Sequence, residues 1–203
     1  MRLELASYRH ADKFLIHWPQ WHEFMALAST ISLPQIEAKQ KQLNFAPVGA
    51  QRATNLLFEV LLTSANGWAQ QAAVFVPQQG LPDRKMDFWK EYLGIEVAFN
   101  NDSYLERIVL RLNAANTIDP TLLGHVVAVG VVVVASQALK TWGSMDPSVT
   151  TFEGASATVR LMVPSFSLPL MLVGLFPETD PVGPSPSFGR DRPKNSLPDE
   201  VAP

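Results

Sequence analysis

A run of ten apolar residues in the second half of the chain constrains the fold more than any other feature. The run, from Val126 to Ala135, consists of valine, alanine and one glycine, with no charged side chain. Because β-branched residues favour strands and both faces would be apolar, it predicts a central strand from His125 to Val134, covered on both faces. The run is too short to predict a membrane span, which needs about 20 apolar residues.

Helical and extended patterns alternate around this strand. A helical pattern runs from Tyr8 to Ile31 with a break at Pro19, and the segment from Leu33 to Val48 has the character of a loop. Interleaved helices and strands indicate an α/β protein with a central mixed β-sheet flanked by helices. Further helices are expected at 49–65, from 101 or 102 to beyond 112, at 136–142 and at 151–162, and further strands at 72–76, 86–89, 93–99 and 168–175.

The last segment of the chain differs in composition from the rest. Residues 177–203 are dense in proline, serine and aspartate and contain almost no aliphatic side chains. Such a segment has too little apolar surface to form a core, so we expect a disordered, proline-rich C-terminal tail. We place one folded domain at residues 1–176 and the tail at 177–203.

Composition and charge exclude several kinds of site. The chain has no cysteine, which excludes disulfides, zinc–thiolate centres, iron–sulfur clusters and a thiol nucleophile. Its net charge of −3, taken alone, weakly disfavours a nucleic-acid partner. The N-terminal residues carry charges where a secretion signal would be apolar, so we expect a cytoplasmic protein with no membrane partner.

The residues with the clearest chemistry lie in a predicted hairpin between residues 85 and 99. With a two-residue turn at Glu91 and Tyr92, Asp87 lies opposite Glu96 on one face. Opposed Cβ atoms are about 4.5–5.5 Å apart, so the two carboxylates repel each other unless a cation lies between them. Two carboxylates, a backbone carbonyl and water form a typical Mg²⁺ site, which polarises a phosphate oxygen and activates water. The alternative is an ordinary hairpin whose acidic residues face solvent.

The hairpin and several other segments together resemble type II restriction endonucleases of the BglII and BstYI group, within the PD-(D/E)xK nucleases. In the hairpin the matching residues are Asp87-Phe88 and, nine residues after Asp87, Glu96-Val97-x-Phe99. The other matching segments, in chain order, are Tyr8-x-His10-Ala11, Trp21-x-Glu23, Asn55-x-x-Phe58-Glu59, Asn66-Gly67-Trp68, Gly130-Val131-Val132-Val133, Ala138-Leu139, Phe152-Glu153 and 169–175. The resemblance covers about residues 8–176.

This resemblance implies a restriction-endonuclease-like fold and a homodimeric enzyme. Such an enzyme hydrolyses both strands of double-stranded DNA at a short palindromic site with Mg²⁺. By the resemblance, Asp87, Glu96 and the backbone carbonyl of Val97 bind the metal. Glu59, and less directly Asn55, lies on a helix that approaches the metal site in this family, so Glu59 would bind the metal through water. The alternative is that Glu59 is an ordinary solvated glutamate.

One position departs from the family pattern. The third motif position, normally lysine, glutamate or glutamine, is Ala98 in this chain. Either Lys85, which the predicted register places opposite Ala98, supplies the missing group, or the protein is a catalytically weak or inactive DNA-binding protein on the same scaffold. The alternative role of Lys85 is that of an exposed lysine beside Asp83 and Asp87.

Candidate DNA contacts follow from charge and position. An acidic chain can still bind DNA when a dimer gathers its basic residues in one cleft. Asn100 and Asn101 follow Glu96 and suit a phosphate or an adenine edge, while capping of the next helix is the alternative role for at least one of them. The basic candidates are Arg84, Lys85, Arg107, Arg111, Lys140 and Arg160.

Overall fold

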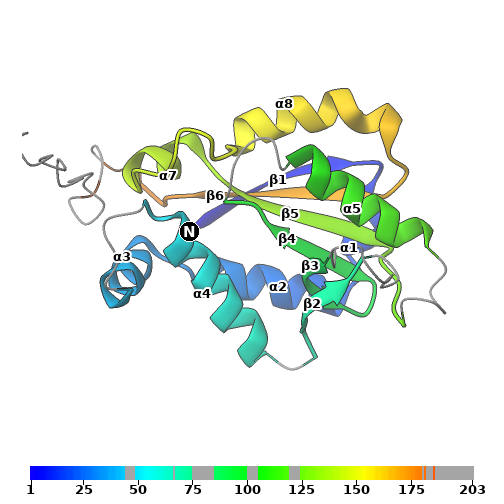
Figure 1. The fold of residues 1–203 in the computed structure, drawn as a ribbon, viewed down its shortest axis with the longest axis horizontal. Coiled ribbons are helices and arrows are strands. Elements are labelled where there is room, and N and C mark those ends of the chain that lie inside the picture. Colours follow the sequence, from blue (N-terminus) through cyan, green and yellow to red (C-terminus); the bar gives the residue numbers. More distant parts are fainter. Residues whose placement is uncertain are drawn as a thin grey trace, which may run out of the picture.

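Six strands form one sheet with helices on both faces in the described part of the chain (Figure 1). The structure is a computed structural model that describes residues 1–43, 49–65, 67–74, 85–99, 105–118, 124–179, 181 and 185. In chain order the elements are β1 (Arg2–Tyr8), α1 (Ala11–Leu15), α2 (Pro19–Ser29), α3 (Leu33–Gln42), α4 (Gln51–Ser64), β2 (Ala69–Ala73), β3 (Lys85–Lys90), β4 (Leu93–Val97), α5 (Leu105–Thr117), β5 (Val129–Ala135), α7 (Gln137–Trp142), α8 (Phe152–Met162), the 3-10 turn η2 (Val163–Ser165) and β6 (Leu170–Phe176).

The sheet is mixed, as the sequence predicted, and its strand order is β1-β6-β5-β4-β3-β2. Strands β4, β5 and β6 are parallel, and β1, β2 and β3 pair antiparallel with their neighbours. All seven residues of β5 are buried, which confirms the predicted central strand, although it begins at Val129 and not at His125. Because parallel strands end at the same edge of a sheet, the residues after Val97 and Ala135 emerge on one side.

Two apolar cores lie on opposite faces of the sheet. Helices α2, α3 and α4 cover one face, and α5 and α8 cover the other (Figure 1). The first core joins Phe58 of α4 to Ile95 and Val131, and the second joins Leu112 of α5 to Val132. Adjacent valines of β5 therefore enter different cores, which explains why this strand has no polar face.

Two N-terminal elements differ from the sequence-based expectation. Residues 2–8 form the partly exposed edge strand β1, so Tyr8 ends a strand where the helical pattern was expected to begin. Residues 33–42 form helix α3 where a loop was expected, because Ile36 is fully buried against α4 although most of the helix is polar. The predicted break at Pro19 is confirmed, since this residue begins α2.

The chain after β6 is described only in part. The strand ends at Phe176, where we expected the folded domain to end. Beyond it, the backbone N–H of Ser185 donates a 2.8 Å hydrogen bond to the carbonyl of Trp142. Residues 180, 182–184 and 186–203 of the expected tail lie outside the described residues. Among the residues described, no helix is long and apolar enough to span a membrane.

Candidate active site

The predicted hairpin is present, with the register and the two-residue turn that the sequence indicated. Strands β3 and β4 pair at Phe88–Ile95, Trp89–Gly94 and Lys90–Leu93. Their ladder ends at Phe88–Ile95, so the expected opposition of Asp87 to Glu96, and of Lys85 to Ala98, is not a backbone pairing. The correction has a local cause, because the side chain of Asp87 takes the place of the next backbone partner.

Asp87 separates the two strands at their open end. Its Oδ2 accepts a 2.8 Å hydrogen bond from the backbone N–H of Val97. One residue later, the N–H of Ala98 donates a 2.8 Å hydrogen bond to the carbonyl of Val133, so the end of β4 stays bound to β5. The carboxyl group of Asp87 therefore lies beside the carboxyl end of β4.

Glu96 is held on the α5 side of the sheet. Its neighbours Ile95, Val97 and Phe99 enter the core under α2 and α4, as alternation along the strand predicted. Glu96 itself is only 2% exposed. The Nη2 atom of Arg111, on α5, lies 3.0 Å from Glu96 Oε2.

The two carboxyl groups interact directly. Burial and the charge of Asp87 raise the pKa of Glu96 to about 9, and Arg111 acts in the opposite direction. Burial also raises the pKa of Asp87, although the Val97 N–H and the Arg111 charge act to lower it. The pair therefore retains a proton at neutral pH in the absence of another cation.

The donor atoms fit a hard divalent cation such as Mg²⁺. Glu96 Oε1 and Asn55 Oδ1 are buried oxygen atoms with no hydrogen-bond partner, and a buried acceptor of this kind is costly unless something binds it. The side chains next to the pair offer carboxylate and amide oxygens, the ligands that Mg²⁺ prefers. In the described part of the chain, no group of three or more histidine, aspartate and glutamate side chains gathers, so protein carboxylates alone would not complete the coordination shell.

A pocket of about 120 Å³ opens beside Asp87. Helix α4 contributes Asn55 and Glu59 to its lining, and β2 contributes Gln70 and Gln71. Phe88 and Val97 complete the lining. The structure thus brings Glu59 to the same pocket as Asp87, as the sequence-based hypothesis requires, while its role stays a prediction.

The remaining sequence-predicted residues lie in different places. Lys85 is exposed at the start of β3, where it pairs with Ala73 of β2. Arg107 is exposed on α5, whereas Arg111, which we expected to line a DNA cleft, is directed at Glu96. Lys140 donates hydrogen bonds to the carbonyls of Pro147 and Val149, which ties its amino group to the protein backbone. Arg84, Asn100 and Asn101 lie outside the described residues.

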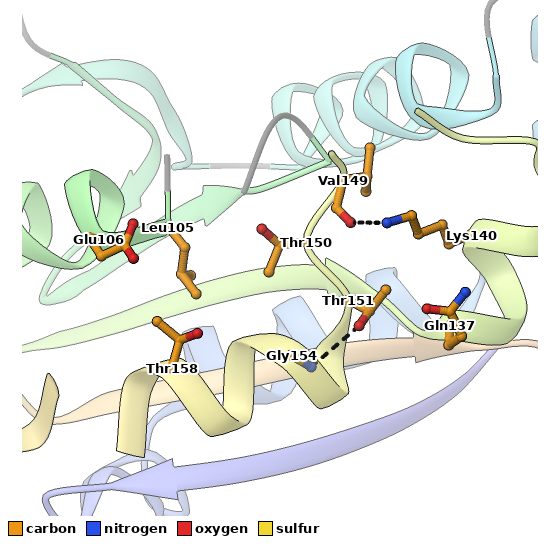
Figure 2. Close-up of a pocket in the computed structure, with 9 residues that line it drawn as sticks. All are labelled: Leu105, Glu106, Gln137, Lys140, Val149, Thr150, Thr151, Gly154 and Thr158. Carbon is orange, nitrogen blue, oxygen red and sulfur yellow. Dashed lines mark hydrogen bonds between the residues drawn. The ribbon is translucent and has the colours of Figure 1, made fainter. Parts of the chain in front are cut away.

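A second, larger pocket of about 210 Å³ lies near the end of β5 (Figure 2). Leu105 and Glu106 of α5 form one wall, and Gln137 and Lys140 of α7 form the other. The connection from Val149 to Thr151 and the first half of α8 close it, with Thr151 capping α8 through a hydrogen bond from the Gly154 N–H. Its lining is mostly polar and follows the carboxyl end of a parallel strand, as Ala135 precedes α7.

Sequence reasoning missed the contact between Arg111 and Glu96. From the sequence, Arg111 was only a basic candidate for DNA contact, whereas Leu105, Ile108, Val109 and Leu112 form the buried stripe of α5. A signal was available, since Arg111 follows Ile108 by three residues and therefore lies at the border of that stripe. Gln70 and Gln71 carried no signal, because their contribution depends on how β2 lies beside β3.

Comparisons with known proteins bear on the family and the fold. A family model described as restriction endonuclease BglII/BglIII matches residues 3–175. No curated protein sequence gives a significant match. A crystal structure of restriction endonuclease BglII complexed with a DNA 16-mer aligns with a TM-score of 0.68 and 19% identity, over 89% of this chain and 79% of that chain. A crystal structure of free BglII aligns with a TM-score of 0.57 and 21% identity, over 89% and 82%.

These matches bear on fold and family in different ways. At such low identity the two solved structures show a shared fold, and they confirm the predicted restriction-endonuclease-like architecture. The family model is matched along nearly the whole folded region, from β1 to β6. The chain therefore belongs to the restriction endonuclease BglII/BglIII family.

Proposed function

We propose that this protein is a Mg²⁺-dependent type II restriction endonuclease that hydrolyses phosphodiester bonds in double-stranded DNA at a short palindromic site. The observation that carries the proposal is the pair of acidic residues Asp87 and Glu96 at the carboxyl edge of the parallel strands, of which one binds the Val97 N–H and the other Arg111. In open α/β sheets, ligands bind outside this edge. Membership of a restriction endonuclease family supports the reaction class.

Asp87, Glu96 and the backbone carbonyl of Val97 would hold the metal. The Val97 N–H fixes the orientation of Asp87, and Arg111 fixes that of Glu96, so both carboxyl groups are oriented before a cation arrives. When bound, Mg²⁺ would polarise a phosphate oxygen and lower the pKa of a water molecule, which is the nucleophile of phosphodiester hydrolysis. Glu59, from its place in the pocket beside Asp87, is assigned as an outer ligand acting through water.

Lys85 is assigned to water activation or charge stabilisation. It precedes Asp87 by two residues on β3 and is exposed, so its long side chain can reach a substrate bound at the surface. Lys85 pairs with Ala73 and not with Ala98. Its assignment therefore rests on its position on β3 and not on the register of the hairpin.

The DNA would lie across the carboxyl edge of β4 and β5. We assign DNA contacts to polar residues that lie in the sequence shortly before β3 or after β4. They are Arg84, Asn100, Asn101, the exposed Arg107 and Arg111. The polar pocket between α5, α7 and α8 lies near the end of β5 (Figure 2). Because cutting both strands of a palindrome requires two symmetry-related sites, we assign a homodimer. We place its action on DNA in the cytoplasm.

A digest of mixed genomic DNA tests the proposal. The purified protein with Mg²⁺ is expected to give discrete fragments whose sequenced ends share one palindromic site. Asp87→Asn and Glu96→Gln should abolish cleavage while the circular dichroism spectrum is unchanged, and Glu4→Gln, a partly exposed position on β1, should cut normally. Full cleavage by either site variant would reject the site, and light scattering that shows only monomers on the cognate duplex would reject the dimer.

Ala98 favours a second candidate function. This residue is 5% exposed within the core under α5, so its own side chain supplies no charged or polar group to the site. The alternative is therefore a DNA-binding protein on the nuclease scaffold that cuts weakly or not at all. Binding of one palindromic duplex without product at any Mg²⁺ or Mn²⁺ concentration would favour it.

A further inference from the structure

The site has no charged or polar side chain at the third motif position, where the family pattern has lysine, glutamate or glutamine. The third motif position, Ala98, lies two residues after Glu96 on the same face of the chain. It is buried among Leu105, Val109 and Leu112 of α5. A long charged side chain at this position would compete with α5 for the space in which the helix packs.

Helix α5 itself brings a cation to the acidic pair. Its Arg111 places Nη2 3.0 Å from Glu96 Oε2, and its charge lowers the pKa of both Asp87 and Glu96. The arginine side chain is 28% exposed, so it is anchored in the protein and still reaches solvent. Its Nε atom is buried and has no hydrogen-bond partner, so it has donor capacity beyond the bond to Glu96.

From this arrangement we infer that Arg111, on α5, supplies the cationic group that position 98 lacks. In this role it binds the phosphate group that water attacks beside Asp87 and Glu96. The inference rests on the proposed function and assigns one more residue to it. A phosphate bound beside both carboxylates lies next to the same guanidinium, whose planar fork suits a phosphate oxygen pair.

The chemistry of arginine restricts the role. A guanidinium stays protonated in proteins, so Arg111 donates hydrogen bonds and charge but does not remove a proton from water. It therefore stabilises negative charge on the phosphate, and proton transfer falls to another group, for which Lys85 is the assigned candidate. Lys85 of β3 and Arg111 of α5 would then together fill the role that a single residue has at the third motif position.

Three readouts on Arg111→Gln test the inference. Glutamine keeps a hydrogen-bond donor and removes the charge. The single-turnover cleavage rate should fall by about 10²–10³-fold, as for loss of one donor to a developing anion. Without DNA, Mn²⁺ should bind by calorimetry as tightly as to the wild type or tighter, since a repelling charge is gone. With Ca²⁺ in place of Mg²⁺, duplex affinity should fall about tenfold, the loss of one charge-assisted bond.

Two further variants serve as controls. Arg111→Lys keeps the charge but loses the planar fork, so its cleavage rate should lie between those of the wild type and Arg111→Gln. Arg9→Gln removes an exposed arginine that bonds the Val163 carbonyl at the opposite end of the sheet, and it should leave all three readouts unchanged.

Each outcome decides between the alternatives. Wild-type cleavage by Arg111→Gln, or a parallel loss of Mn²⁺ affinity and cleavage, overturns the inference, since the second result means that Arg111 only shapes Glu96. If the wild type binds a duplex but never cuts it, the proposed function fails, and the Ca²⁺-dependent duplex affinity still decides whether Arg111 meets a phosphate. If the wild type binds no duplex, both fail.

Discussion

The backbone N–H of Val97 donates a 2.8 Å hydrogen bond to Oδ2 of Asp87, and this bond replaces the next rung of the β3–β4 ladder. A side chain thus takes over a backbone position at the point where the two strands separate. The same bond fixes one carboxylate oxygen of Asp87 and leaves the other oxygen for a cation. The end of the hairpin is therefore the point where the two strands separate and where the carboxyl group of Asp87 is oriented.

Two substitutions of Asp87 separate these two functions. Asp87→Asn keeps an oxygen that accepts the Val97 N–H but loses the charge, so cleavage should vanish while stability changes by less than about 1 kcal/mol. Asp87→Ala removes both, so it should also lower the free energy of unfolding by about 1–3 kcal/mol, because the Val97 N–H loses its acceptor. Urea denaturation and a Mg²⁺-dependent digest measure the two effects. Equal stability of the two variants would contradict the structural half of the prediction.

The stability of the metal-free protein should fall as the pH rises. The folded pKa of Glu96 is about 9, above its usual 4.5, so the fold favours the protonated form. Its contribution is complete below the unfolded pKa and is lost as the pH rises through the folded value. The raised pKa of Asp87 acts in the same direction. With EDTA present, the loss between pH 6 and pH 9 is up to about 4 kcal/mol for one proton over three pH units. Tm should therefore drop by about 10 °C, since about 1 kcal/mol moves the Tm of such a domain by 2–4 °C.

Glu96→Gln provides the control for this pH dependence. The amide is uncharged at every pH, so its Tm should vary much less between pH 6 and pH 9. Added Mg²⁺ should restore the Tm of the wild type at pH 9 and leave that of the variant unchanged, because binding to the folded state alone stabilises it. A wild-type Tm that rises with pH in EDTA would show that the carboxyl pair does not hold a proton.

The sequence predicted the parts of this molecule that depend on neighbours along the chain. The register of the hairpin followed from a two-residue turn, and the buried strand β5 followed from its uninterrupted run of apolar residues. Helix α3 was missed because only Ile36 and Gln40 of its residues are buried, so its stability comes from packing against α4. The contact between Arg111 and Glu96 was missed for a related reason, because it depends on how closely α5 approaches the sheet.

Lys85→Ala tests the remaining candidate for water activation. If Lys85 assists proton transfer or charge stabilisation, the single-turnover rate should fall by about 10²-fold with Mn²⁺ affinity unchanged. The pH–rate profile should also lose one ionisation. Lys13→Ala, an exposed position on α1, is the matched control and should have no effect. Unchanged turnover in Lys85→Ala would remove this residue from the mechanism.

The close approach of α5 depends on two glycines that face each other in β4 and β5. Gly94 pairs with Gly130, and a Cβ on either would come within 3.2 Å of a methyl group of Leu112. At Gly130 the added Cβ would also lie 2.7 Å from Leu168 Cδ2. Gly130→Ala should therefore lower the free energy of unfolding by about 1–3 kcal/mol through overpacking.

The glycine prediction can be checked against a matched substitution and a double variant. Gly154→Ala in α8 meets only Thr151 Oγ1 at 3.5 Å, so it should be neutral or raise stability by up to about 1 kcal/mol through helix propensity. Leu168→Ala should compensate part of the cost of Gly130→Ala, because the new methyl group fills the space that leucine leaves. Additive free energies in the urea-denaturation cycle would mean that the clash is relieved elsewhere and that α5 is not fixed by these two glycines.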